Sequence, residues 1–369
     1  MKLHCHRPSL VAALQAVSAV VPTRTPKEIL KNVKLVVEDG RVTLQATDQE
    51  VGIHQVIEGV ETDSAGVALL PASRLLSILR ELTDEAADIE ITQDSIQIRS
   101  GRSDFKLSAE DPAEYPAIPT GDEGNAFGIE SGKLRKMVRR TAFATDVEST
   151  RYALGGLQLE VIGDDVTLAA TDSRRLAVIK SKTASGSGPD GGKPPVIPTK
   201  AMSLLERNIP DDDTVTQITL RDNDVLFQCA NTTVYSRLVE GRFPQYRDVI
   251  PSESRFDIEL IVGTFYAAIR QAQIVTDEES RGVDFNFNDG VLTLSSTAAD
   301  IGHSTIEVPI GYDGEELTIT FDPRYIADFL KVLDQESSVT LKLTDGESAA
   351  VFTTDDDYTY VIMPLARDR

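Results

Sequence analysis

The stretch VTLQATD at residues 42–48 decides the fold, because it recurs almost unchanged as VTLAATD at residues 166–172. A weaker copy, LTLSSTA, stands at residues 292–298. In each copy apolar residues alternate with polar ones, which is typical of a strand with one buried face. Repetition at long and nearly equal separation indicates tandem copies of one domain.

Two further elements recur at about the same separation. A strand leads into a short helix in each copy, at residues 66–82, 195–208 and 317–333. Two strands then close each copy, at residues 95–107, 225–238 and 349–363, and an apolar residue followed by proline comes next or ends the second strand. Three concordant elements in the same order favour one domain in three copies.

Polar, turn-rich stretches at residues 121–125 and 251–254 separate the copies. The sequence therefore predicts an α+β protein with domains at residues 1–122, 123–252 and 253–369. A length of 369 residues agrees, since it allows two to three domains.

Composition restricts the compartment. Hydrophobic residues make up 41% and charged residues 26% of the chain, the balance of a soluble globular protein, and no apolar run could span a bilayer. The N-terminus lacks the apolar core of a secretory signal. Two cysteines, Cys5 and Cys229, suit a reducing compartment. We expect a cytoplasmic protein with no membrane partner.

The charge balance limits contact with nucleic acid. Lysine and arginine number 37 and aspartate and glutamate 59, so the net charge is −22. Such a chain repels phosphates as a whole, and any contact with DNA needs a local basic surface. We therefore expect weak binding to free DNA.

The predicted helix at residues 131–144 offers such a surface. At 100° per residue its apolar side carries Leu134, Met137, Val138 and Thr141. The other side carries Lys133, Arg135, Lys136, Arg139 and Arg140. A phosphate-contacting face and an ordinary solvated helix face both remain open interpretations.

Two other motifs do not carry chemistry. Residues 186–191 match the dinucleotide pattern GxGxxG, but GKPP follows at residues 192–195, where no helix can begin to receive a pyrophosphate. We interpret residues 184–193 as a flexible connector. His4 and His6 share one face of a strand, Cys5 points the other way, and further donors are too few for a metal site.

The acidic runs at residues 211–213 and 355–357 lack the spacing of a calcium loop and are interpreted as solvated turns. No serine, cysteine or lysine stands in a recognisable nucleophile setting. The sequence therefore predicts neither a catalytic site nor a cofactor nor a bound metal.

Three segments carry a resemblance to a known family. ATDSRRLAV at residues 170–178 resembles an ATDxxRLA segment, EGRFPQYR at 240–247 a GRFPxY segment, and VIMPL at 361–365 a VMPL or VMPM ending. Shorter matches stand at residues 100–103 and 281–283. The family is the bacterial DNA polymerase III beta subunit, the DNA sliding clamp, and the similarity runs in order along the whole chain.

The resemblance implies three copies of the clamp (processivity) domain and a ring-forming head-to-tail homodimer, with helices inside and sheets outside. Such a ring would encircle duplex DNA without reading its sequence. It would tether the replicative polymerase and other replication or repair proteins, with no catalytic activity of its own. A topological hold also reconciles the acidic charge with a function on DNA.

The resemblance further implies a peptide-binding pocket between the second and third domains. Its matching positions are Leu154, Thr171, Ser173, Arg174, Arg175, Leu176, Pro244, Val249, Tyr325, Val361, Met363, Pro364 and Leu365. Ordinary core at a domain junction is the alternative interpretation of these residues. The implied partners are the DNA polymerase III alpha subunit, the clamp loader and other proteins that carry a clamp-binding motif.

Two more sets follow from the same matches. The positions for DNA contact are Arg24, Arg80, Tyr152 and Lys200, beside Lys133, Lys136, Arg139 and Arg140 of the basic helix. The positions for the seam between two copies are Ile78, Phe105 and Leu107 in the first domain and Ile274 and Val275 in the third.

The chain departs from the family's pattern at several positions. Ala153 stands where a second tyrosine is common, Arg174 where many relatives carry histidine, and Asp248 where a second arginine is common. The tail at residues 365–369 is slightly longer than usual. These departures affect details of the pocket.

Two other classes of function remain as alternatives. An oligomeric repeat scaffold that never touches nucleic acid agrees with the acidic charge and disagrees with the basic helix. A nucleotide-binding enzyme would depend on the glycine-rich loop at residues 186–191.

Overall fold

The computed structural model describes residues 1–121, 125–149, 153–188, 191–276 and 281–366. These residues form two compact units. The first holds residues 1–135, 183–192 and 200–238, and the second holds residues 136–182, 193–199 and 239–369. Because both units take part of the second predicted domain, the boundaries after residues 122 and 252 stay predictions.

The first unit contains a five-stranded antiparallel sheet. Its order is β5 (Val60–Thr62), β1 (Lys2–His6), β7 (Ala86–Ile91), β8 (Ser95–Ser100) and β9 (Ser103–Ser108). In β1 the side chains of Leu3 and Cys5 are buried, while His4 and His6 are exposed. The predicted alternation in this strand is confirmed.

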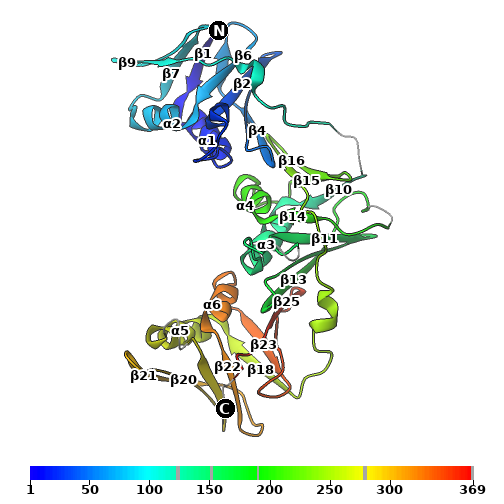
Figure 1. Cartoon of the computed structure of the whole chain (residues 1–369). Helices are drawn as coiled ribbons and strands as arrows, with labels where there is room; N and C mark the ends of the chain where they lie inside the picture. The colour runs from blue at the N-terminus through cyan, green and yellow to red at the C-terminus, as the bar shows by residue number, and fades with distance from the viewer. Residues whose placement is uncertain (122–124, 150–152, 189–190, 277–280, 367–369) are drawn as a thin grey trace. The chain divides into compact units, whose positions relative to one another are not determined.

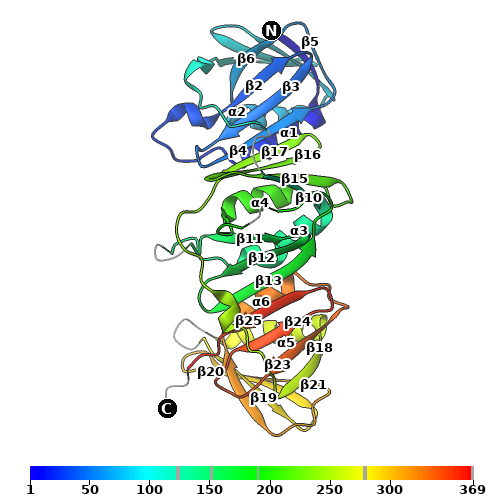
Figure 2. The same ribbon diagram turned by 90° about the vertical axis from the view of Figure 1, so that its right-hand side faces the viewer.

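The second sheet of this unit has eight strands. Their order is β10 (Asn125–Glu130), β15 (Val215–Leu220), β16 (Asp224–Cys229), β17 (Thr232–Arg237), β4 (Val51–Ile57), β3 (Arg41–Thr47), β2 (Asn32–Glu38) and β6 (Gly66–Pro71). Strands β17 and β4 pair antiparallel, with Tyr235 opposite Gly52 (Figure 2). This pairing joins strands of two predicted domains, and we call it the first junction.

Helices α1 (Arg7–Ser18) and α2 (Ala72–Glu81) pack against each other, and α1 also packs on β3 and β4 (Figure 1). Their apolar faces are fully buried at Leu14, Val17, Leu75 and Leu79. Helix α4 (Thr199–Asn208) has its predicted bounds. Short 3-10 turns lie at η1 (Glu28–Lys31) and η2 (Pro112–Glu114).

Part of the predicted connector is ordered. Ala184 and Ser185 lie along the free edge of β10, where the Gly128 amide donates to the Ser185 carbonyl at 2.7 Å. Gly186 has a φ of +68°, and a Cβ built on it would stand 2.9 Å from the Ala126 carbonyl oxygen. Only glycine suits this close approach, so these glycines shape a turn that covers a strand edge.

The second unit repeats the plan. Its eight-stranded sheet has the order β14 (Val196–Pro198), β11 (Gly156–Ile162), β12 (Asp165–Thr171), β13 (Arg175–Lys182), β25 (Tyr358–Ile362), β24 (Ala350–Thr353), β23 (Ser338–Leu343) and β18 (Phe256–Ile261). Strands β13 and β25 pair antiparallel, with Leu176 opposite Val361 (Figure 2). We call this pairing the second junction.

A four-stranded sheet completes this unit, in the order β21 (Gly302–Pro309), β20 (Val291–Ala298), β19 (Val283–Asn288) and β22 (Leu317–Phe321). Helices α5 (Val262–Ala272) and α6 (Pro323–Lys331) pack together. Asp322 caps α6 as predicted, because its carboxylate accepts from the Arg324 amide at 3.1 Å. Short 3-10 turns lie at η4 (Tyr246–Val249) and η5 (Gln273–Val275).

Helix α3 (Ser131–Thr141) is shorter than predicted, since residues 142–144 form the 3-10 turn η3 (Ala142–Ala144). Near the end of α3 the Thr141 hydroxyl donates to the Met137 carbonyl at 2.8 Å. The predicted apolar face is confirmed, because Leu134, Met137, Val138 and Thr141 are all buried.

The repeated segments of the sequence are β3, β12 and β20, and their neighbours correspond in the same order. Strands β4, β13 and β21 follow them, and β9, β17 and β25 close the three repeats. At the two junctions the closing strand β17 pairs with β4, and the closing strand β25 pairs with β13. Within the described residues, β9 and β21 each have one neighbouring strand.

Candidate functional site

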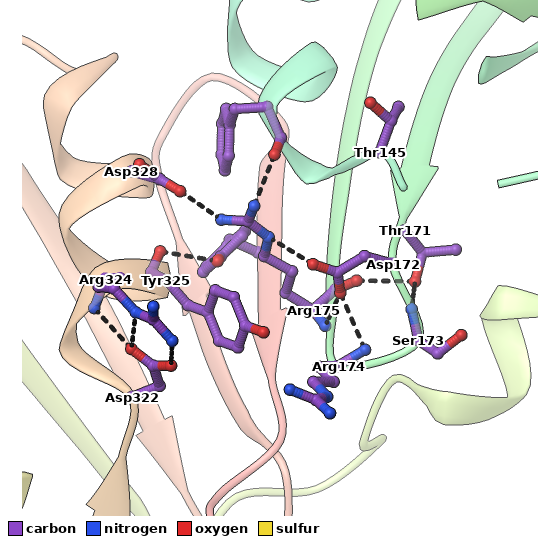
Figure 3. Close-up of polar contacts among 12 residues, drawn as sticks. Thr145, Thr171, Asp172, Ser173, Arg174, Arg175, Asp322, Arg324, Tyr325 and Asp328 are labelled. Carbon is purple, nitrogen blue, oxygen red and sulfur yellow. Dashed lines mark hydrogen bonds and ion pairs between the residues drawn. The ribbon is translucent and has the colours of Figure 1, made fainter. Parts of the chain in front are cut away.

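The turn between β12 and β13 fixes the backbone of the candidate site (Figure 3). The Thr171 hydroxyl donates to the Arg175 carbonyl at 2.7 Å, and Asp172 Oδ1 accepts from the amides of Arg174 and Arg175 at 2.9 and 3.0 Å. Ser173, at the tip, has a φ of +74°, which disfavours a residue with a Cβ. The ATD segment is thus a turn-forming motif that presents two arginines.

Arg175 connects this turn to helix α6. Its Nε donates to Asp172 at 2.9 Å and its Nη1 to Asp328 of α6 at 2.7 Å. Its Nη2 donates to the Phe143 carbonyl at 2.7 Å. Its side chain is only 10% exposed, and it lies 4.7 Å from the centre of the Tyr325 ring. Charge-assisted hydrogen bonds of this kind are strong when shielded from water.

Tyr325 and Arg174 lie at the edge of the same region (Figure 3). The Tyr325 carbonyl accepts from the Tyr360 hydroxyl at 2.8 Å, which fixes the start of α6. A hydrogen bond with Tyr325 raises the pKa of the exposed Arg174 guanidinium. Neighbouring Asp322 is already paired with Arg324 at 2.5 Å. Arg174 therefore presents its charge at the rim.

An apolar cluster lies beneath. Its buried members are Ala153, Ala169, Leu176, Val178, Val196, Phe243, Tyr246, Val351 and Val361. Pro244 follows Phe243, whose ring meets the Tyr246 ring edge-on at 6.1 Å. The cluster therefore combines the GRFPxY segment with β13 and β25.

The predicted pocket residues all fall in the second unit, at different depths. Leu154, Thr171, Leu176 and Val361 are buried, while Pro244, Pro364 and Leu365 are half-buried. Met363 is 47% and Val249 55% exposed, which is unusual for large apolar side chains. The Met363 amide donates to the Arg174 carbonyl at 2.9 Å, so the chain end follows the turn. Buried core and an exposed apolar rim therefore occur together here.

Four of the eight predicted DNA-contact residues form ion pairs with acidic side chains. Lys133 pairs with Glu130 at 2.8 Å, and Lys136 and Arg140 both pair with Asp356 in the turn between β24 and β25. Lys200 pairs with Asp48. Arg24 and Arg139 are exposed and have no carboxylate partner among the described residues, and Arg80 lies against the Gln15 amide. Tyr152 lies outside the described residues.

Asp356 was missed by reading the sequence, because its acidic run resembles a solvated turn. Burial acts to raise its pKa, but hydrogen bonds from Lys136, Thr354 and Arg140 lower the pKa well below the usual value. Asp328 was missed as well, since it stands 153 residues from Arg175 in the chain. No local sequence pattern predicts either contact.

The predicted seam residues are exposed or half-buried. Phe105 is 37% exposed on β9, Leu107 follows on the same strand, and Ile78 is half-buried on α2. Ile274 is 74% exposed and Val275 half-buried in η5. Exposed apolar side chains beside a strand edge suit an interface.

Among the described residues, no group of three or more histidine, cysteine, aspartate or glutamate side chains could hold a metal ion. No helix in the described ranges is both long and apolar enough to cross a membrane.

Solved structures share this fold over the full chain. A sliding clamp from Pseudomonas aeruginosa matches with a TM-score of 0.92 at 30% identity, and covers 100% of both chains. A DNA polymerase sliding clamp from Bacillus subtilis matches with a TM-score of 0.92 at 29% identity, over 100% of this chain and 99% of the other. The fold thus defines a protein of three tandem clamp domains.

Sequence comparison gives the family. Models of the DNA polymerase III beta subunit match with the N-terminal domain at residues 1–119, the central domain at 128–245 and the C-terminal domain at 247–366. The beta sliding clamp of Chlamydia muridarum is 30% identical over 368 residues, 99% of both chains. That of Pseudomonas putida is 30% identical over 371 residues, 99% of this chain and 100% of the relative. The chain belongs to the DNA polymerase III beta subunit family.

Proposed function

We propose that two copies of this chain form a closed ring around duplex DNA and act as a processivity clamp in the cytoplasm. The proposal depends on one observation, the repeated strand pairing at the two junctions. At each junction the closing strand of one repeat (β17 or β25) pairs with a strand of the repeat before it (β4 or β13), which directly follows the repeated segment there. A further pairing of the same kind, between β9 of one copy and β21 of another, would join two chains head to tail.

The register of this seam follows from the junctions. Tyr235 lies opposite Gly52 in the first, and Val361 opposite Leu176 in the second. Lys106 corresponds to Tyr235, because each faces the third residue of the preceding strand. His303 faces Thr297 as Leu176 faces Thr171. We therefore expect Lys106 of one copy opposite His303 of the other, beside the apolar seam residues named above.

A disulfide tests this register. Opposite residues in antiparallel strands have Cα atoms about 4.5–5.5 Å apart, within the range that a disulfide bridges. Lys106→Cys with His303→Cys should give covalently linked dimers on oxidation. Lys106→Cys with Thr305→Cys, shifted by two residues, is the matched control and should link poorly. Equal linking of both pairs would contradict the register.

The ring would hold DNA by topology rather than by affinity. The contacts would be sequence-independent and made by Arg24, Arg80, Lys133, Lys136, Arg139, Arg140, Tyr152 and Lys200. A clamp loaded on circular DNA should stay bound at several hundred millimolar salt and leave when the circle is cut. Loss at that salt from circular and linear DNA alike would contradict the proposal, because it would reveal ordinary counterion-release binding.

Partners would bind the second junction. The exposed Met363 and Val249 above a buried apolar cluster suit a short apolar motif inserted from another protein. The thirteen predicted pocket residues are proposed as its lining. The DNA polymerase III alpha subunit, the clamp loader and other proteins with such a motif are the proposed ligands. Competition between a motif peptide and the polymerase for the clamp would test this site.

The alternatives make different predictions. Reversing the charge at Arg139 would leave an oligomeric scaffold unaffected but would impair loading or sliding of a clamp. Deleting residues 186–192 would abolish a nucleotide-binding activity. For a clamp, a variant in which a short turn replaces these residues and still covers the edge of β10 should keep its retention on circular DNA.

A further inference from the structure

Asp356 is held by cations that the proposed function assigns to DNA. Its two oxygens both accept from Arg140 Nη1 at 2.8 Å, and Lys136 Nζ also donates to it. The Thr354 hydroxyl donates to Oδ1 at 2.5 Å. An anion bound by one guanidinium, one ammonium and one hydroxyl has the surroundings that proteins give to a phosphate.

The cations themselves differ in freedom. Arg140 is 11% exposed, lies 5.1 Å from the centre of the Tyr358 ring, and its carbonyl accepts from the Tyr358 hydroxyl at 2.6 Å. Lys136, one turn earlier on α3, is 48% exposed. Arg140 is thus fixed by the hairpin, while Lys136 can turn toward another anion without unfolding anything.

A second carboxylate, Asp48, likewise pairs with a cation that the proposed function assigns to DNA, Lys200 of α4. Asp48 Oδ1 accepts from the Glu50 and Val51 amides at 2.9 and 2.8 Å, which holds the carboxylate in the turn after β3. Its Oδ2 accepts from Lys200, whose side chain is 51% exposed. The Asp48 side chain is only 16% exposed and is held by these two amides, whereas its lysine partner is about half exposed.

We propose that Asp356 and Asp48 occupy the phosphate positions of the DNA-contacting cations and thereby keep the clamp's contact with DNA weak. The inference depends on the proposed function, because it assigns Lys136, Arg140 and Lys200 to DNA. A phosphate that binds these cations must displace a carboxylate already there, so each contact gains little. Weak, exchangeable contacts let the ring move along the duplex without a preferred position.

Asp356→Asn tests the proposal on the intact clamp. The amide keeps an oxygen for Thr354 but loses the charge, so Lys136 becomes available to phosphates while Arg140 stays fixed by the hairpin. Binding to short linear duplex DNA should strengthen several-fold at low salt. The slope of log affinity against log salt should steepen by about 0.9 for each phosphate gained, hence by about 1.

Asp355→Asn is the matched control. It removes the same charge one residue away, and Asp355 is exposed with no ion-pair partner among the described residues. An equal change in slope for both variants would overturn the proposal, because it would reveal a general effect of net charge. An unchanged slope for Asp356→Asn would overturn it as well.

Lys136→Gln in the Asp356→Asn background gives a third measurement. If the carboxylate acts by occupying Lys136, most of the gain in slope should disappear in the double variant. Asp48→Asn, with Lys200→Gln as its partner change, repeats the design in the first unit. Should Asp356→Asn lower the melting temperature strongly, the Asp48 pair decides the matter alone.

The outcome is separable from the proposed function. Retention on circular DNA at high salt depends on ring closure and should stay the same in Asp356→Asn. One-dimensional diffusion along DNA should slow, because each freed cation must release a phosphate before the ring moves. Loss of retention together with the expected steeper salt slope would contradict the ring and would still support the role of Asp356.

Discussion

The two junctions use one turn for different purposes. In the first, the Thr47 hydroxyl donates to the Val51 carbonyl at 2.8 Å, and in the second the Thr171 hydroxyl donates to the Arg175 carbonyl at 2.7 Å. The residue at the tip has a positive φ in both, 82° at Gln49 and 74° at Ser173. The repeated ATD segment therefore fixes the same backbone twice.

The side chains around this turn differ. Gly52 in the first junction corresponds to Leu176 in the second, and Tyr235 to Val361. Ile118 packs with Leu226 and Tyr235, and its Cγ2 would lie 2.7 Å from a Cβ on Gly52. Ile118, which lies in the segment between the first and second repeats, thus fills the first junction. A side chain at position 52 would collide with it.

The rims differ as well. Arg237 pairs with Glu50 at 3.7 Å in the first junction. The corresponding residues of the second junction are Met363 and Arg174, which carry no such ion pair and leave an apolar side chain exposed. The comparison teaches that the same backbone makes a closed joint at one place and, at the other, a surface with an exposed apolar side chain, through four or five side chains.

Removing Arg175 should break the second junction and give the largest effect. Arg175→Ala leaves Asp172 Oδ2 and the Phe143 carbonyl without their side-chain donor, and losing one partner of a buried pair typically costs about 3–5 kcal/mol. Chemical unfolding should show this loss, together with weaker binding of a motif peptide. Arg237→Ala is the control, because it and its partner Glu50 are 60% and 66% exposed, and it should cost less than about 1 kcal/mol. A similar small cost for Arg175→Ala would contradict the assigned role.

Emptying the first junction should cost somewhat less. Ile118→Ala removes a buried side chain and leaves a cavity beside Gly52, at a cost of about 2–4 kcal/mol. Peptide binding at the second junction should be unchanged. Denaturant titration measures the first quantity and fluorescence anisotropy the second; a stability equal to that of the parent would show that the linker does not fill the joint.

Exchanging the rims should close the second junction. Arg174→Glu with Met363→Arg transfers the ion pair of the first junction to the second. We expect peptide affinity to fall at least about tenfold, or about 1.4 kcal/mol, because the apolar rim is lost. Each single variant serves as a control for the charge alone. Calorimetric titration that gives the parent's affinity for the double variant would refute the idea that this rim admits peptides.

Acid should weaken the first junction specifically. Burial, helped by nearby Lys34, lowers the pKa of His54 on β4 to about 4, and its Nε2 has no hydrogen-bond partner among the residues that the structure describes. The unfolded chain takes up this proton near pH 6.5, so folding stability falls between pH 6.5 and 4. Each unit of pKa difference is at most about 1.4 kcal/mol, less for a partly exposed ring. In His54→Gln this slope should flatten, as measured by unfolding at several pH values; an identical slope would assign the acid sensitivity elsewhere.

Relaxing the turn should have the smallest effect. Ser173→Gly removes the strain of a positive φ and should stabilise the second junction by up to about 1 kcal/mol. Gln49→Gly is the same change in the first junction and should behave alike. Melting temperatures of both variants test this, and opposite signs would show that the two turns are less alike than their hydrogen bonds indicate.

The repeat made much of the fold predictable. Strand periodicity located β3, β12 and β20, and the spacing of capping residues located α2, α4 and α6 to within two residues. Sequence also named Arg175 and Leu176 as site residues through the family resemblance. These features are local, or recur within one chain, and therefore leave a pattern that can be read.

The contacts between distant residues could not be predicted. Arg140 and Asp356 stand 216 residues apart, so nothing near Asp356 distinguishes it from Asp355 or any solvated acid. For the same reason, the glycine-rich connector gave no sign that Ser185 would cover the edge of β10. The sequence of one chain records which residues are available, whereas the pairing depends on how the repeats meet.

Strands β9 and β21, each with one neighbouring strand in the described part of the chain, have a consequence for assembly at high concentration. An end-to-end contact between identical chains limits the number of subunits only through curvature, since every added copy offers a new free end. A substitution that straightens one junction would therefore favour open filaments whose length grows with protein concentration. Light scattering of junction variants would detect such growth directly.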